Sequence, residues 1–277
     1  MSKNEIFMQL MRNNQWEDFR NFACFTFLNR SYSVFNCALI LLQRPGATIV
    51  KNENNWSKVG RFISPDATPL ILMQPGGPVM LAYDYSDTYG EEPFPAYEYK
   101  QEYDTRRKVE ISSEQYSKMI ERLKRYGIAY SEKKFGERRY GQAAALESVQ
   151  YTYYSAKKPK EQTVKVEAHF LITINSTLTP HEKALALFHE LGHIYCGHLN
   201  GKRTKANCVP EFRSFIDPHV EEFEAEMTCK LICDRSNYYE NCDEYLKSHM
   251  DNGCVPPYSK IDVFLAVDKI RRILGLY

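Results

Sequence analysis

Residues 179–193 read TPHEKALALFHELGH, and this stretch decides how the second half of the chain is interpreted. Thr179 is a helix-capping residue, Pro180 suits the first helical position, and Glu182 completes a capping box three residues after the cap. These signals predict that a helix begins here. They do so independently of the H-E-x-x-H motif that the same stretch contains.

On that helix, His189 and His193 lie about one turn apart and share one face. Two imidazole nitrogens so placed reach a single tetrahedral Zn²⁺ at about 2.0–2.1 Å each. Glu190 is rotated by about 100° from His189, which directs its carboxylate toward a metal-bound water. We therefore predict Zn²⁺ as the cofactor, His189 and His193 as ligands, and Glu190 as the catalytic acid/base.

A catalytic zinc takes three protein ligands and keeps one position open for water or substrate. In the pattern H-E-x-x-H-x-x-G-x-x-H the third histidine would fall on Leu199, so His198 is one position out of register. The better candidate for the third ligand lies further along the chain.

Residues 217–226, DPHVEEFEAE, predict a second helix with an aspartate cap and a proline at its first position. Among the four glutamates of this stretch, only Glu222 and Glu226 are spaced i,i+4. We expect Glu222 to be the third ligand and Glu226 to accept the Nδ1–H of a zinc-binding histidine. The other two glutamates are expected to face elsewhere and to be dispensable for zinc: Glu221 and Glu224.

Outside the two motifs the sequence predicts an α+β protein. Residues 164–174 alternate as a strand, and residues 112–126 form a capped helix. Nearer the N-terminus we expect two helices, three short β segments and a turn, in that order: 9–28, 32–42, 48–50, 70–73, 79–82 and 75–78. A Pro- and Tyr-rich stretch separates the parts, which predicts domains at residues 1–98 and 99–277.

Composition bounds the class of protein. The chain has 277 residues, of which 43% are hydrophobic and 26% charged, with a net charge of +1. No stretch approaches the roughly 18 apolar residues of a membrane span, and the N-terminus lacks a signal-peptide core. We expect a cytoplasmic protein without a membrane partner. Eight cysteines without a C-x-x-C pair argue against a disulfide scaffold or a zinc ribbon and predict buried thiols.

Charge is unevenly distributed along the chain. Residues 1–99 carry a net −2, residues 100–163 a net +6 and residues 164–277 a net −3. The middle segment is therefore the one region with a basic surplus that could attract a polyanion. The alternative interpretation is an ordinary solvated face of helix and hairpin.

The sequences HELGH and EEFEAE together resemble the zincin domain of ImmA/IrrE-type metallopeptidases and of ArdC-like antirestriction proteins. The form E-E-x-x-A-E is closest to the ArdC-like group. This resemblance implies a zincin-like metallopeptidase domain over residues 99–277, with the HExxH helix and a glutamate-bearing second helix. It extends to the C-terminus, where AVDKI at residues 266–270 looks like the closing helix of the family.

In ArdC-like proteins the zincin follows a single-stranded-DNA-binding domain. The first 98 residues resemble that domain in the runs YSxxN at 32–36, QxPxAT at 43–48 and YDYSxTxG at 83–90. The resemblance implies that single-stranded DNA is a partner and that five residues contact it: Tyr32, Asn36, Arg44, Trp56 and Arg61. This chain departs from the family at residues 64–68, where SPDAT replaces a basic turn.

Two functions follow from the resemblance. The first is a mobile-element protein that combines single-stranded DNA binding with a zinc-dependent, gluzincin-like peptidase and serves antirestriction or DNA protection. The second is an ImmA-like protease that cleaves a regulatory protein, with the N-terminal domain recognising protein. Glu190 separates catalysis from a purely structural metal, because hydrolysis needs a base and coordination does not.

Overall fold

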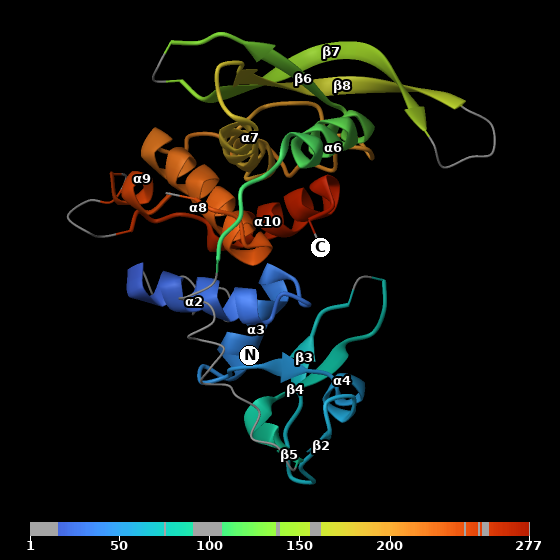
Figure 1. Cartoon of the computed structure of the whole chain (residues 1–277), viewed down its shortest axis with the longest axis vertical. Helices are drawn as coiled ribbons and strands as arrows, with labels where there is room; N and C mark the ends of the chain where they lie inside the picture. Colours follow the sequence, from blue (N-terminus) through green and yellow to red (C-terminus); the bar gives the residue numbers. More distant parts are fainter. Residues whose placement is uncertain are drawn as a thin grey trace. The chain divides into compact units, whose positions relative to one another are not determined.

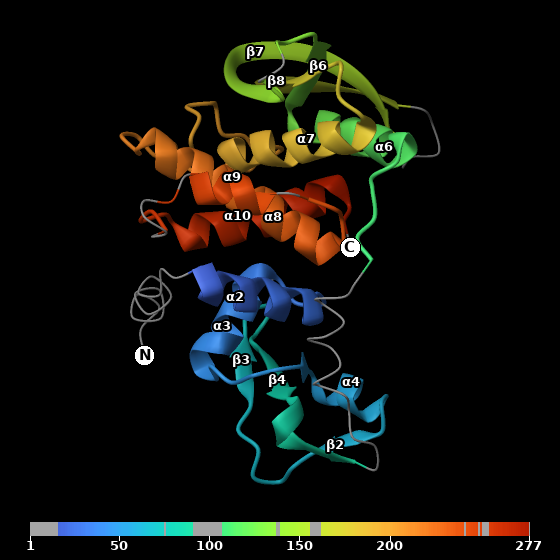
Figure 2. The same ribbon diagram turned by 60° about the vertical axis from the view of Figure 1, so that its left-hand side comes forward.

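A computed structural model describes residues 16–74, 76–90, 107–136, 139–155, 162–240, 242–248, 250 and 255–276. It shows an α+β protein that divides into two compact units, residues 1–107 (unit 1) and residues 108–277 (unit 2). The boundary expected at residues 98/99 lies outside the described residues. Figures 1 and 2 show the two units in two views.

Unit 1 places two helices against a small antiparallel sheet. Helix α2 (Trp16–Leu28) and helix α3 (Val34–Gln43) agree with the two expected helices over the described residues. The sheet has the order β1-β4-β3, from β1 (Val50–Lys51), β4 (Met80–Asp84) and β3 (Leu70–Leu72). A continuous core between helices and sheet is formed by Phe25, Tyr32, Cys37, Ile40, Ala47, Val50, Leu70, Leu72 and Ala82. The expected turn at 75–78 includes Pro75, which lies outside the described residues.

A second, two-stranded sheet in unit 1 was not expected from the sequence. It pairs β2 (Arg61–Ile63) with β5 (Thr88–Gly90) in antiparallel register, and helix α4 (Glu53–Ser57) precedes it. The two strands lie far apart in the sequence, and their pairing is set by a register that no local pattern encodes.

Unit 2 is layered. Its sheet has the order β6-β8-β7, from β6 (Ile128–Lys133), β8 (Gln162–Asn175) and β7 (Gly141–Ser155). Helices α6 (Ser113–Leu123) and α7 (Pro180–Tyr195) lie beneath the sheet, and α8 (Pro218–Ser236) and α10 (Lys260–Leu274) lie on the far side of α7 (Figures 1 and 2). The short helix α9 (Cys242–Ser248) contacts α8.

The sequence explains most of these elements. Ser112 and Gln115 form the capping box of α6, and Gly127 follows the next turn with a φ of 67°, the left-handed conformation that glycine favours. In β8, alternate apolar side chains are fully buried, which gives the strand its period of two: Ala168, Phe170, Ile172 and Ile174. Strand β7 was not expected, because its first half contains three consecutive alanines, which have little β propensity.

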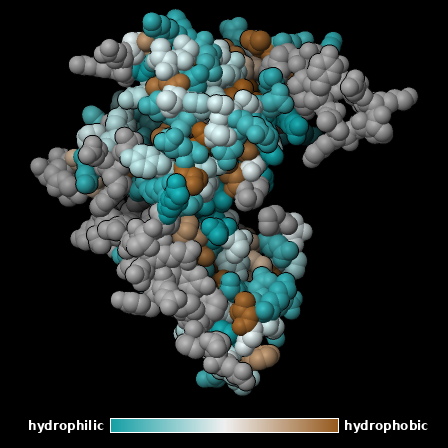
Figure 3. Space-filling view, in the orientation of Figure 1, coloured by the Kyte–Doolittle hydropathy of each residue, from teal (hydrophilic) through white to brown (hydrophobic). Residues whose placement is uncertain are grey.

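The surface of the described residues is mixed. Apolar side chains on the face in view form separate small patches among hydrophilic ones (Figure 3). None of the described helices is long and apolar enough to cross a membrane. Cys208 is exposed, whereas the other cysteines described are buried and free, as expected.

Candidate metal centre

Helix α7 begins as the sequence predicts. Thr179 is its N-cap and Pro180 its first residue. Both hydrogen bonds of the capping box are present: the Thr179 side chain accepts from the backbone N–H of Glu182, and the Glu182 side chain accepts from the backbone N–H of Thr179. The cap fixes where the helix starts and therefore which residues face α8. One face of α7 presents His189 and His193, whose imidazole centroids lie 4.9 Å apart.

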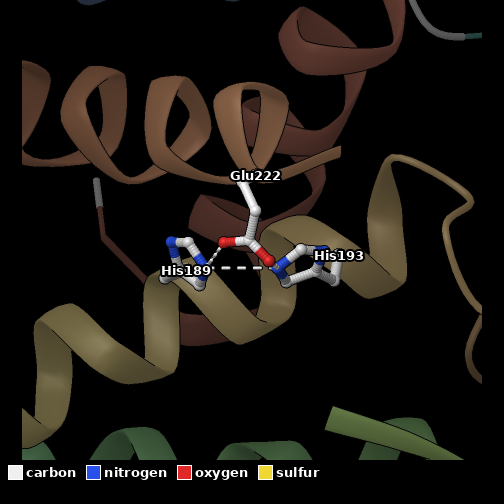
Figure 4. A group of neighbouring side chains, drawn as sticks. All are labelled: His189, His193 and Glu222. Carbon is white, nitrogen blue, oxygen red and sulfur yellow. Dashed lines mark hydrogen bonds and ion pairs between the residues drawn. The ribbon is translucent and has the colours of Figure 1, made fainter. Parts of the chain in front are cut away.

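Three side chains from two helices converge on one point. The Nε2 atoms of His189 and His193 are 3.1 Å apart. The carboxylate of Glu222 on α8 lies 3.3 Å from Nε2 of His189 and 3.6 Å from Nε2 of His193. Figure 4 shows Glu222 reaching from α8 toward both rings. These ligand atoms all lie within 4.8 Å of one another, so the three residues can hold one metal ion.

Small residues allow the two helices to approach closely enough. A Cβ added to Gly192 would lie 2.9 Å from Cα of Ala225 and 3.0 Å from its carbonyl oxygen. Gly192 lies in the HELGH motif and Ala225 in the EEFEAE motif. Their contact sets the separation of α7 and α8, and thereby the position of Glu222 opposite the two histidines.

Glu226 supports His189. Its Oε2 lies 2.9 Å from Nδ1 of His189, on the side of the ring opposite Glu222. If His189 binds a metal through Nε2, its Nδ1 is protonated and donates a hydrogen bond to Glu226. This hydrogen bond fixes both the tautomer and the orientation of the ring. This is the geometry expected from the i,i+4 spacing of Glu222 and Glu226.

Replacing Glu226 by Gln should weaken Zn²⁺ affinity by about 10–100-fold without unfolding the chain, because the amide holds the ring less firmly than the carboxylate does. Competition with a graded series of chelators measures the change, and circular dichroism checks the fold. Glu221→Gln is the matched control on the same helix. Equal zinc retention in the two variants would remove Glu226 from the site.

A longer chain of contacts supports His193. Its Nδ1 lies 3.0 Å from Nδ1 of His198, and Nε2 of His198 lies 2.7 Å from Oε2 of Glu224. A single set of tautomers satisfies both contacts when His193 coordinates through Nε2: His193 donates to His198, and His198 donates to Glu224. Arg213 in turn donates two hydrogen bonds to the Glu224 carboxylate, at 2.6 and 3.1 Å.

Glu224 belongs to this chain of contacts. It does face away from the metal ligands, as expected, but it is fully buried and accepts a hydrogen bond from His198 behind His193, a structural role that the sequence did not predict. Burial would raise the pKa of Glu224, but hydrogen bonds from His198 and Arg213 outweigh it and lower the pKa. The sequence offered one indication of this role in His198. This histidine is one position away from the third-ligand position of the extended motif, and in the structure it contacts Nδ1 of His193 instead of the metal centre.

A second group, Cys196, His198 and Glu224, also brings possible ligand atoms together. Its carboxylate is already bound by Arg213 and by the backbone N–H of Ser259 at 2.7 Å. Burial raises the pKa of the Cys196 thiol, so the thiolate that a metal needs is disfavoured. We therefore assign this group to the support of His193.

Glu190, the expected acid/base, follows His189 on α7 and is buried. Its side chain is 7% exposed, and burial raises its pKa to about 7, although the charge of His189 opposes the rise. The start of β7 covers it: a Cβ added to Gly141 would lie 2.9 Å from Oε1 of Glu190. A larger residue at position 141 would displace the carboxylate or the neighbouring side chain of Ile174. A carboxyl group that titrates near neutrality suits proton transfer.

The electrostatics of the centre favour a cation. Burial lowers the pKa of His189, but its hydrogen bonds to Glu222 and Glu226 outweigh burial and raise the pKa. Burial and the neighbouring charge of His189 lower the pKa of His193. Two imidazole nitrogens and one carboxylate, with surplus negative charge around them, fit a divalent metal ion.

In unit 1 the five residues expected to contact DNA are built into the fold. Trp56 has no exposed surface, and its Nε1–H donates to the carbonyl of Tyr83 at 2.9 Å, so no base can stack on it. Asn36 bonds the backbone N–H and carbonyl of Met73, both at 2.9 Å. Trp56 therefore fills the core and presents no exposed face for the expected contact with DNA.

The remaining three have structural partners as well. Tyr32 belongs to the core and is 8% exposed. Arg61 is buried and donates to Oγ1 of Thr88 at 2.7 Å, while Arg44 pairs with Asp87. The residues that carry the resemblance in unit 1 therefore stabilise its fold.

Comparison with known proteins adds no assignment to this geometry: no family model, no curated protein and no solved structure matches the chain.

Proposed function

We propose that unit 2 is a zincin-like, zinc-dependent metallopeptidase domain. The observation that carries the proposal is the convergence of His189, His193 and Glu222, with the buried Glu190 next to the first histidine on the same helix. Two histidines and a glutamate leave an open fourth position on a tetrahedral ion, which is typical of catalytic zinc.

A zinc ion bound there supplies a Lewis acid for the scissile carbonyl and lowers the pKa of water toward about 7. Glu190 then accepts the proton of the attacking water and delivers it to the leaving amine. Glu226 and the chain from His198 to Glu224 keep the two imidazoles oriented during this step. The protein residues thus cover proton transfer and ligand orientation.

The sheet supports a peptide as the substrate. Among the described strands, β7 pairs only with β8 and is therefore an edge strand, and the backbone of Ala143 on this strand hydrogen-bonds the Glu190 carboxylate. That strand begins at Gly141, directly against Glu190. An extended peptide can add to such an edge through main-chain hydrogen bonds, which brings its backbone beside the base.

The test is hydrolysis of a proteome-derived peptide library by the zinc-loaded full chain, with new termini detected by mass spectrometry. We expect cleavage that a chelator abolishes and added Zn²⁺ restores. Elemental analysis should give about one zinc per chain. Failure to bind zinc, or zinc binding without any new termini, would refute the proposal.

For unit 1, single-stranded DNA binding remains a proposal, now with different residues. Phe62 and Tyr89 lie opposite one another on β2 and β5, with ring centroids 5.9 Å apart. They are 54% and 56% exposed, so both rings offer a surface on which bases can stack. With unit 2, we propose the antirestriction or DNA-protection function of a mobile element that the resemblance implies.

Replacing Phe62 and Tyr89 by Ala should weaken binding of oligo-dT to the full chain by about 1–3 kcal/mol per stacked base. Fluorescence anisotropy at low salt measures the affinity, and Tyr140→Ala is the control, since Tyr140 is 57% exposed in unit 2. If the wild-type chain binds no single-stranded DNA, unit 1 becomes a protein-recognition module and the function becomes site-specific cleavage of a regulatory protein.

A further inference from the structure

Tyr245 places a hydroxyl group beside the metal centre, although the sequence analysis gave it no role. It lies on α9, with its OH 3.4 Å from Oε2 of Glu222 and its ring 6.4 Å from the ring of His189, nearly perpendicular to it at 76°. The residue is 45% exposed, and the side chain of Glu222 is 38% exposed. Both are therefore accessible from solvent on the side of the centre that Glu222 occupies.

The segment that carries Tyr245 is firmly anchored. On α9, Cys242 and Leu246 are buried at 4% and 0% exposure. Just before the helix, the Glu240 carboxylate accepts hydrogen bonds from Lys108 at 2.8 Å, Lys230 at 3.0 Å and the backbone N–H of Cys242 at 2.6 Å. Burial would raise the pKa of Glu240, but the two ammonium groups lower it to about 2, so this anchor stays ionised.

Hydrolysis of a peptide creates negative charge on the oxygen of the scissile carbonyl. A preorganised donor aimed at that oxygen stabilises the transition state more than the ground state. A phenol has an ordinary pKa of about 10 and is protonated at neutral pH, so it can donate. In the proposed mechanism Glu190 transfers the proton and the three ligands hold the metal. The hydrogen bond to the oxyanion must therefore come from another residue.

We propose that Tyr245 is a catalytic residue of unit 2 that donates a hydrogen bond to the developing oxyanion of the scissile peptide bond. This inference rests on the proposed peptidase function. In the absence of substrate the hydroxyl lies against Glu222. Because a phenol hydroxyl hydrogen rotates about the C–O bond, the same hydroxyl can donate to a carbonyl oxygen that comes within hydrogen-bond distance.

The test compares Tyr245→Phe with the wild-type full chain on the library peptide that the wild type cleaves fastest. We expect kcat to fall by about 100-fold, the lower range seen when one oxyanion donor is removed, with KM and Zn²⁺ affinity unchanged. A phosphonamidate analogue of the same peptide should lose affinity by the same factor as kcat/KM. Tyr239→Phe is the matched control, since Tyr239 is 54% exposed and its ring lies near His181.

Three outcomes overturn the inference, and they are distinguishable. An unchanged kcat in Tyr245→Phe refutes the donor role and leaves the peptidase intact. A loss of Zn²⁺ affinity like that expected for Glu226→Gln shows that Tyr245 braces Glu222 instead. A wild-type chain that cleaves no peptide refutes the proposed function itself, and the inference with it.

Discussion

Glu190→Gln should lower the rate of peptide hydrolysis by about 10²–10⁴-fold, the range that a positioned acid/base contributes, while the zinc content stays the same. The amide has nearly the shape of the carboxyl group but cannot accept the proton of water. It still fits the space beneath Gly141, so the fold should be retained. Stopped-time mass spectrometry on a cleaved library peptide measures the rate.

The matched control for this variant is Glu221→Gln, which changes a glutamate that touches none of the three proposed ligands in the contacts described. Its rate should equal that of the wild type. Cleavage by Glu190→Gln at the wild-type rate would mean that another group acts as the base, and the assignment of Glu190 would fail even with zinc in place. Loss of zinc in that variant would instead make Glu190 part of the coordination.

Glu222→Ala should lose its zinc on dialysis, because it removes one of three protein ligands and leaves two imidazoles on one helix. The loss of affinity should exceed the about 10–100-fold expected from a residue that only orients a ligand. Elemental analysis after dialysis against a weak chelator measures it. Unchanged zinc content would move the third ligand to another residue.

The neighbouring glutamates make this an informative series. Glu221→Ala should keep its zinc. Glu224→Ala should destabilise unit 2 by about 3–5 kcal/mol, because it leaves the guanidinium of Arg213 and the imidazole of His198 without their buried partner. Urea unfolding of the metal-free chains distinguishes the two effects. Metal-free Glu222→Ala should unfold at the same urea concentration as the metal-free wild type, whereas Glu224→Ala should unfold at a lower one.

The candidate centre was largely predictable because its signals are local. The capping box of Thr179 and Glu182 fixes the start of α7, and the helical repeat then brings His189 and His193 to one face. The spacing of Glu222 and Glu226 likewise fixes which two glutamates share a face of α8. Neither inference needs to know where the two helices lie.

The nucleic-acid candidates show the limit of such reasoning. Trp56 and Arg61 were identified by residue type and by resemblance, but residue type does not reveal exposure. The structure buries the indole and pairs the guanidinium with Thr88, whereas the exposed aromatic pair is formed by Phe62 and Tyr89. Cross-strand pairs depend on the register of two strands that are far apart in the sequence.

The sequence by itself determined the helices that carry the candidate ligands, the caps of those helices, the strand at β8 and the spacing of the candidate ligands along each helix, because each depends on neighbours within about one turn or one strand. Only the tertiary structure decided what surrounds the centre. His198 meets Glu224, Gly141 covers Glu190 and Tyr245 reaches Glu222 across loops whose path no local pattern encodes. Helix periodicity is a short-range property, whereas the support of a metal ligand and the place of a donor depend on how whole elements pack.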